Sequence, residues 1–181
     1  SYVEAFADEL SAFRAFAGHY PETTLLVDTY DTLGGVENVL RLADELGNDF
    51  RVQAIRIDSG DLDALSRAAR ERLDTAGHTD IRIIVSGGLG EQRIAELVAS
   101  GAPIDGFGVG TDLVVSRDAP TLDFAYKLVS YAGEPRMKVS PDKVSLPGAK
   151  QVFRRWADGL FAGDTIAGSR EALAGEPLLQ P

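Results

Sequence analysis

The residues best suited to chemistry stand in four short polar or glycine-rich segments, each directly after or around an apolar run. They are Asp28-Thr29-Tyr30-Asp31, Arg56 to Asp61, Ser86-Gly87-Gly88 and Gly108-Val109-Gly110-Thr111. A single Asp or Ser at such a place often does no more than cap the helix that follows. Four segments at equivalent places favour a shared binding site over four unrelated caps.

The last two segments predict a phosphate-binding site. They contribute two hydroxyls and four glycines, namely Ser86, Gly87, Gly88, Gly108, Gly110 and Thr111. Glycines let the backbone approach a phosphate closely, and amide hydrogens at the start of a helix donate to it. Tight turns that hold no ligand are the alternative. The segments are not a Walker loop, because no Gly-Lys-Ser or Gly-Lys-Thr follows a glycine run.

Arg56 stands two residues before Asp58, so in an extended strand the two side chains point to the same face. A guanidinium matches the planar carboxylate of a ligand. An aspartate can accept hydrogen bonds from sugar hydroxyls or hold a metal through water. An internal Arg–Asp pair without a ligand is the alternative, and the spacing alone leaves these interpretations open.

The segments lie in a pattern of apolar and amphipathic stretches that alternate four times, which predicts βαβ units around a parallel sheet. The predicted strands cover 25–27, 54–57, 81–85 and 104–109, and the predicted helices cover 36–46, 62–73 and 94–98, with glycine stops at 47, 77 and 101. All four polar segments then lie at the carboxyl ends of strands, the edge that carries the active site in α/β barrels. We expect an α/β fold with a partial (β/α) barrel of about four βα units over residues 1–120.

After Thr111 the pattern changes to short apolar stretches separated by turns, which predicts a C-terminal antiparallel β appendage. The expected strands cover 124–131 and 136–139, on either side of an Ala-Gly-Glu-Pro turn, and 151–156. We place this appendage at residues 121–170 and expect a loose tail at 171–181, which is rich in Gly, Pro and Ala.

Composition narrows the possible partners. With 28 acidic and 18 basic residues the net charge is −10, which disfavours nonspecific attraction to nucleic acid or to an anionic membrane. The absence of cysteine excludes disulfides and thiolate metal sites and is consistent with a reducing compartment. No apolar run approaches the roughly 18 to 20 residues that span a bilayer. We expect a cytoplasmic protein that binds any anion through a local site.

Several segments resemble nicotinate phosphoribosyltransferases in their order along the chain. They are 26–32, 55–62, 86–89, 106–111 and 126–129, followed by the similar stretches 136–140 and 147–152. The resemblance covers roughly residues 1 to 156. The joint order of these segments along the chain is highly specific.

This resemblance implies a type II phosphoribosyltransferase that joins nicotinate to PRPP, giving nicotinate mononucleotide and pyrophosphate in NAD salvage. It also implies Mg²⁺, ATP hydrolysis coupled through a phosphohistidine, and a homodimer. By similarity Arg56 would bind the nicotinate carboxylate, and the catalytic carboxylates would be Asp58 beside the ribose and Asp28, which would orient the phosphorylated histidine. The 5-phosphate would be held by Gly87, Gly88, Gly108, Gly110 and Thr111.

One departure from the family pattern concerns that histidine. In the family it directly precedes a Ser followed by an aromatic residue, and this chain begins at Ser1-Tyr2. His19 and His78 do not match the motif, so we expect both to be ordinary surface residues. The resemblance therefore implies a C-terminal portion of the enzyme that starts just after the phosphohistidine motif and is weak or inactive alone.

Alternative functions stay open on the sequence. One is a catalytically inactive barrel remnant that packs against a partner. Another is a related phosphoribosyltransferase that uses quinolinate or nicotinamide, since Arg56 could also contact an amide, and a phosphosugar isomerase would share the same kind of phosphate site. Arg117 is a further candidate for the 5-phosphate, and Lys138 and Lys150 are candidates for a phosphate or ATP contact.

Overall fold

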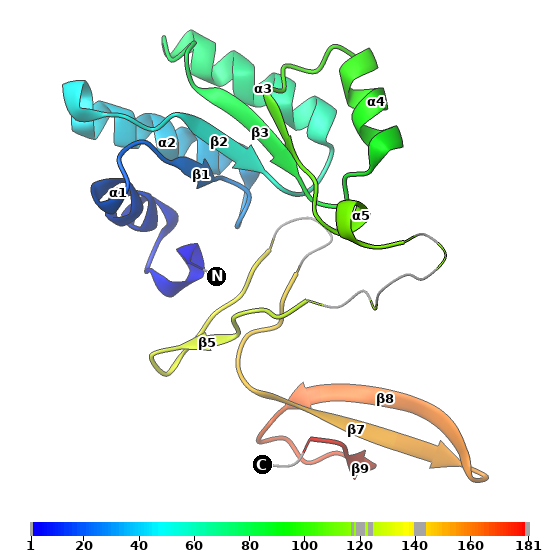
Figure 1. The fold of residues 1–181 in the computed structure, drawn as a ribbon. Helices are drawn as coiled ribbons and strands as arrows, with labels where there is room; N and C mark the ends of the chain where they lie inside the picture. Colours follow the sequence, from blue (N-terminus) through cyan, green and yellow to red (C-terminus); the bar gives the residue numbers. More distant parts are fainter. Residues whose placement is uncertain (1, 117, 119–121, 123–124, 140–143, 180–181) are drawn as a thin grey trace. The chain divides into compact units, whose positions relative to one another are not determined.

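The computed structural model describes residues 2–116, 118, 122, 125–139 and 144–179. The chain forms two compact units. The first consists of Ser1–Lys127 with Lys138–Ser145, and the second of Leu128–Met137 with Leu146–Pro181. Both are drawn in Figure 1, and each is described here by itself.

The first unit is built on a four-stranded parallel sheet. Its strands are β1 (Thr24–Leu26), β2 (Ala54–Ile57), β3 (Arg82–Ser86) and β4 (Gly106–Gly108), and they lie side by side in the order of the chain (Figure 1). All four predicted strands are present. The bounds of β2 are those predicted, β1 and β3 are shifted by one residue, and β4 is shorter than the predicted 104–109.

The described residues of this unit form five helices, and those between consecutive strands make the connections that parallel pairing requires. The five are α1 (Glu9–His19), α2 (Thr32–Leu46), α3 (Leu62–Thr75), α4 (Glu91–Ala99) and α5 (Thr111–Val114), with short 3-10 turns η1 (Val3–Ala5) and η2 (Gly47–Asp49). Aspartates cap the first three: Asp8 accepts from the amide of Ser11, Asp31 from that of Gly34, and Asp61 from those of Asp63 and Ala64. In the described part of the chain, no helix has the length and apolarity needed to cross a membrane.

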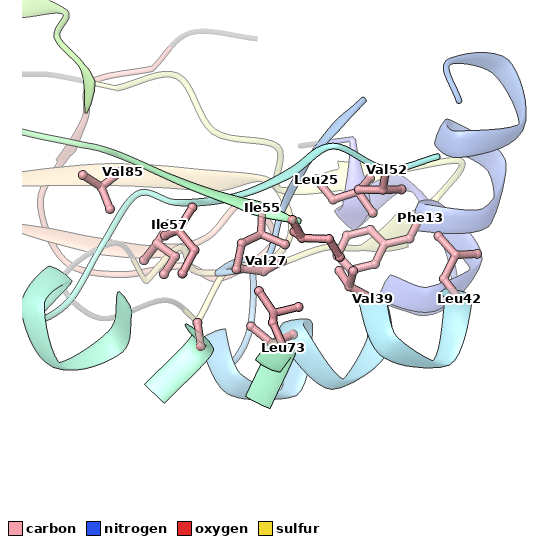
Figure 2. Close-up of a cluster of buried hydrophobic side chains, with 14 of the residues drawn as sticks. Phe13, Leu25, Val27, Val39, Leu42, Val52, Ile55, Ile57, Leu73 and Val85 are labelled. Atoms are coloured by element: carbon pink, nitrogen blue, oxygen red, sulfur yellow. The ribbon is translucent and has the colours of Figure 1, made fainter. Parts of the chain in front are cut away.

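One face of the sheet packs on the helices and forms the core (Figure 2). Its apolar side chains are 5% exposed or less: Phe13, Val39, Leu42 and Leu73 from helices, with Leu25, Val27, Val52, Ile55, Ile57 and Val85 from the strands and their flanks. Burying each such side chain stabilises the fold by about 1.5–3 kcal/mol. Since successive strand residues point to opposite faces, the residues between them turn away from the helices.

Those alternate residues form a row across the other face. Leu26 of β1 is in register with Arg56 of β2, which is in register with Ile84 of β3, and Ile84 with Gly106 of β4. Arg56 is exposed, and Leu26 and Ile84 are half-buried. The face opposite the helices therefore presents a cation to whatever fills the space beside it.

Helix α2 lies unusually close to the end of β1. A Cβ atom added to Gly35, in the first turns of α2, would lie 2.1 Å from the backbone oxygen of Val27. Only glycine fits here without displacing the helix. The loop between the two elements contains Asp28 and Asp31, so this close approach helps to fix their positions.

The second unit is antiparallel, as predicted for the appendage. Strands β5 (Ser130–Tyr131) and β6 (Glu134–Pro135) form a short hairpin, and β8 (Leu160–Gly168), β7 (Lys150–Ala157) and β9 (Glu176–Pro177) form a sheet in that order. The β7–β8 turn is Asp158-Gly159, with φ of 51° and 75°, which suits a two-residue hairpin loop. Strand β8 was not predicted, no strand forms at 136–139, and residues 123 and 124 lie outside the described part.

Candidate functional site

The predicted substrate-binding residues and Asp58 line one pocket at the carboxyl ends of β2, β3 and β4. Its volume is about 330 Å³. Its lining is Arg56, Asp58, Ser86, Gly87, Gly88, Leu89, Gly108, Val109, Gly110, Thr111 and Asp112. Residues as far apart in the sequence as Arg56 and Asp112 thus meet, because the ends of adjacent parallel strands lie at the same edge of the sheet.

The glycines of the pocket serve different geometric needs. Gly87 and Gly88, in the turn after β3, have φ of 88° and 60°, a conformation that other residues adopt at a cost. A Cβ on Gly108 would lie 3.1 Å from that of Ser86, so its absence lets β4 approach β3 closely. A Cβ on Gly110 would meet nothing within 4 Å, so this glycine borders open space.

Asp28 does not line the pocket, but it binds the backbone of Asp58, which does. It is 1% exposed. Its Oδ2 accepts a hydrogen bond from the backbone amide of Asp58 at 3.1 Å and another from the hydroxyl of Ser59. The carboxylate at the end of β1 therefore holds the turn that follows β2, and with it the backbone of Asp58.

Asp58 continues the chain of contacts across the sheet. Its Oδ1 accepts a hydrogen bond from Ser86 Oγ at 2.5 Å and lies 3.7 Å from a guanidinium nitrogen of Arg56. The internal Arg–Asp pair considered above thus exists, but its distance is long and the Arg56 side chain is 46% exposed. Such an exposed pair contributes little to stability. Arg56 is therefore accessible to a ligand.

Arg56 also lines a second hollow, of about 220 Å³. This hollow is largely apolar and includes Tyr2, Phe13, Phe16 and Leu26. The ring of Tyr2 lies 5.1 Å from that of Phe16 in an edge-to-face arrangement. Arg56 thus lines both the glycine-rich pocket and the aromatic hollow, an arrangement suited to a flat ring that carries an anionic group.

The histidines lie away from the pocket. His19 is exposed at the end of α1, and the half-buried His78 lies with its ring 5.6 Å from Phe50. Within the residues that the structure describes, no three His, Cys, Asp or Glu side chains gather in a way that could hold a metal ion. Lys150 Nζ donates to the carbonyl of Gly148, and Arg117 lies outside the described residues.

Two acidic residues near the site were not singled out from the sequence. Asp112 lines the pocket. Its Oδ2 lies close to Gly90, since a Cβ added to that glycine would lie only 2.2 Å from it. Glu9, in the first turn of α1, is only 6% exposed. Burial raises the pKa of Glu9 to about 7, the Asn38 hydrogen bond opposes this, and the charges of Asp28 and Asp31 add to it. An acid in the first turn of a helix is usually a solvated residue that complements the helix dipole, so the sequence gives no signal of this burial.

No family model matches the chain. Nicotinate phosphoribosyltransferase pncB2 of Mycobacterium tuberculosis is 60% identical to it over 181 residues, which is 100% of the chain. The chain is homologous to the nicotinate phosphoribosyltransferases. The family resemblance of the sequence segments is thereby confirmed. The nicotinate phosphoribosyltransferase of Bacillus subtilis is 45% identical over 159 residues, or 84% of the chain.

The chain corresponds to only part of these family members. It spans 39% of the length of the M. tuberculosis relative and 32% of that of the B. subtilis relative. A crystal structure of nicotinate phosphoribosyltransferase from Porphyromonas gingivalis matches 76% of the chain with a TM-score of 0.56 and 21% identity, covering 37% of that structure. At this identity the match supports the mixed α/β fold and no further property.

Proposed function

We propose that this chain forms the substrate-holding part of a nicotinate phosphoribosyltransferase, which joins nicotinate to PRPP and releases pyrophosphate in NAD salvage. The observation that carries the proposal is the meeting of Arg56, Asp58 and both glycine segments in one pocket. Homology along the whole chain to relatives of that name supports the same reaction.

In this proposal the glycine segments hold the 5-phosphate of PRPP. The positive φ angles of Gly87 and Gly88 turn the backbone sharply after β3, and Gly110 leaves space beside the loop after β4. A phosphate in that space would receive backbone amides and the hydroxyl of Thr111. Local donors of this kind are what an anion needs on a chain with a net charge of −10.

Arg56 binds the carboxylate of nicotinate in this proposal. Its side chain is 46% exposed, and Arg56 lines the aromatic hollow, so in this proposal the pyridine ring lies in the hollow while its carboxylate meets the guanidinium. An uncharged amide would gain less from the guanidinium than a carboxylate does. Nicotinamide is therefore the weaker candidate, although Arg56 could still contact it.

The two candidate catalytic carboxylates have different roles in this proposal. As the C1–O bond to pyrophosphate breaks and the bond from the pyridine nitrogen to C1 forms, positive charge develops on the ribose ring. Asp58 donates its backbone amide to Asp28, and its carboxylate accepts from the Ser86 hydroxyl, so this carboxylate is placed to stabilise that charge. Asp28 would in addition orient the histidine through which the family couples ATP hydrolysis.

The cofactor and assembly implied by the family belong to the same proposal. The described residues offer no group of three acidic or histidine ligands, so Mg²⁺ would be held mainly by the pyrophosphate of PRPP rather than by a cage of side chains. The order β1-β2-β3-β4 is that of consecutive units in an α/β barrel, and we infer that the sheet is a segment of one. A cytoplasmic homodimer completes the proposal.

An NMR titration of the isotope-labelled chain with ribose 5-phosphate tests the central assignment. The amides of residues 86–89 and 108–111 should shift, and Gly110→Val should abolish the shifts without unfolding the chain, because its side chain would enter open space. Gly18→Val on α1, also in open space, is the matched control and should bind normally. Equal shifts in the wild type and Gly110→Val would remove the phosphate assignment.

A companion titration separates the aromatic substrates. Nicotinate should shift residues around Arg56 and bind more tightly than nicotinamide, and Arg56→Ala should remove that preference. Quinolinate binding more tightly than nicotinate would favour the alternative transferase. No binding of either phosphate or pyridine would favour the inactive remnant that packs against a partner.

A further inference from the structure

Glu9 is a buried acid that the proposed chemistry does not use. It lies at the start of α1 with 6% of its surface exposed. Its Oε2 accepts one hydrogen bond, from Asn38 Nδ2 of α2 at 3.0 Å. Its Oε1 is buried and has no hydrogen-bond partner among the described residues. An ionised carboxylate in such a place is poorly compensated, whereas a neutral carboxylic acid tolerates it better.

The charges around Glu9 are negative. Asp28 and Asp31, in the loop between β1 and α2, both act on it electrostatically, and η1, which packs on α1, carries the buried acid Glu4. Arg14, one turn further along α1, is paired with Glu45 of α2 at 2.9 Å. No basic side chain of the described residues is among the causes that set the pKa of Glu9, which burial raises to about 7.

We propose that Glu9 is a positioning residue for Asp28: the proton on its buried carboxyl determines how firmly Asp28 holds the turn after β2. When Glu9 releases this proton to solvent, a second negative charge appears near the Asp28 carboxylate in a poorly solvated region. Like charges repel strongly where water is excluded. The Asp28 carboxylate and its bonds to the Asp58 amide and the Ser59 hydroxyl must then adjust.

The effect reaches the pocket through Asp58. The amide of Asp58 is tied to Asp28, and its carboxylate lines the pocket and binds Ser86. The catalytic importance of this link rests on the proposed function, but the coupling between Glu9 and the Asp58 backbone does not. The geometry of the candidate site is thus linked to a proton on a helix outside the pocket.

NMR of the 181-residue chain without ligand tests the coupling. In the wild type, the side-chain carboxyl carbon of Glu9 and the backbone amide of Asp58 should titrate together with a midpoint of about 7. In Glu9→Gln, which resembles the neutral acid in shape, the Asp58 amide should not shift between about pH 6 and about pH 8. Glu45→Gln is the matched control: it breaks another contact between α1 and α2 and should leave the Asp58 titration unchanged.

Three results would overturn the proposal. One is a Glu9 carbon that titrates below about pH 5, near the range of exposed Glu residues. A second is an Asp58 titration that persists in Glu9→Gln, and a third is its loss in Glu45→Gln. The wild-type measurement alone decides the first point even if Glu9→Gln does not fold. Failure of ribose 5-phosphate to bind would count against the proposed function and leave this coupling intact.

Discussion

Replacing Gly35 by alanine should destabilise the chain, although alanine is the better helix former. The added Cβ would lie 2.1 Å from the oxygen, 2.8 Å from the carbonyl carbon and 2.9 Å from the Cα of Val27. All three are backbone atoms of the segment after β1, so no side chain can rotate away. Relief requires that α2 move outward by roughly 1 Å, to normal van der Waals distance.

The cost of that movement follows from what α2 buries. Val36, Val39 and Leu42 are all 0% exposed. A gap of up to 1 Å removes a quarter to a half of the van der Waals attraction of each of these side chains, or about 1 kcal/mol for each. Replacing a glycine by alanine inside a helix stabilises the helix by about 1 kcal/mol, which offsets part of this loss. We therefore expect Gly35→Ala to lower the free energy of unfolding by about 2 kcal/mol, and Tm by about 4–8 °C.

Denaturation followed by circular dichroism measures this difference, with Gly18→Ala as the matched control. Gly18 also lies in a helix, and a Cβ there meets nothing within 4 Å. Its replacement should stabilise the chain by up to about 1 kcal/mol. A Gly35→Ala variant as stable as the wild type would refute the close approach of α2 to β1.

Three further predictions concern Glu9, Asp61 and the two histidines. Burial raises the pKa of Glu9 from its ordinary 4.5 to about 7 in the folded chain. Between these pH values Glu9 binds more protons in the folded chain than in the unfolded chain, so the free energy of unfolding should fall as pH rises through this window. Glu9→Gln should remove up to roughly 3 kcal/mol of that fall, measured as the difference in unfolding free energy between about pH 4.5 and about pH 8; an unchanged pH dependence would contradict it. Asp61→Ala, which removes the cap of α3, should lower stability by about 1 kcal/mol in urea denaturation, and no loss would show the cap to be dispensable. Incubation with ATP should give no phosphohistidine by mass spectrometry, and its appearance on His19 or His78 would contradict the prediction that neither is the phosphorylated histidine.

The sheet and the pocket could be predicted because their residues are tightly constrained by position. The strand 54–57 has the bounds predicted, since a short run rich in β-branched apolar residues followed by Asp58-Ser59-Gly60 is typical of a buried strand that ends in a turn. The pocket glycines could be found for a similar reason, because a sharp turn with positive φ after a strand favours residues without side chains. Their meeting in space followed from the parallel order alone.

Other features depend on contacts that no local pattern shows. Helix α2 begins at Thr32 rather than at 36, because the Asp31 cap overcomes the poor helix propensity of Gly34-Gly35. Strand β8 contains Gly163 and Asp164, residues typical of turns, and forms because the Asp158-Gly159 turn pairs it with β7, where Arg154 binds Asp164 at 2.8 Å. The burial of Glu9 likewise arises from the packing of α1 on α2.

The alternation along β2 separates two kinds of selection. Ile55 and Ile57 point into the core and are 0% exposed, whereas Arg56 between them points to the other face. Folding therefore constrains the isoleucines, and in the proposed function ligand recognition constrains the arginine. In that proposal, a mutation at 56 alters which aromatic acid or amide is preferred at little cost in stability. The proposed ligand preference would then evolve by single substitutions on β2 without compensating changes in the core.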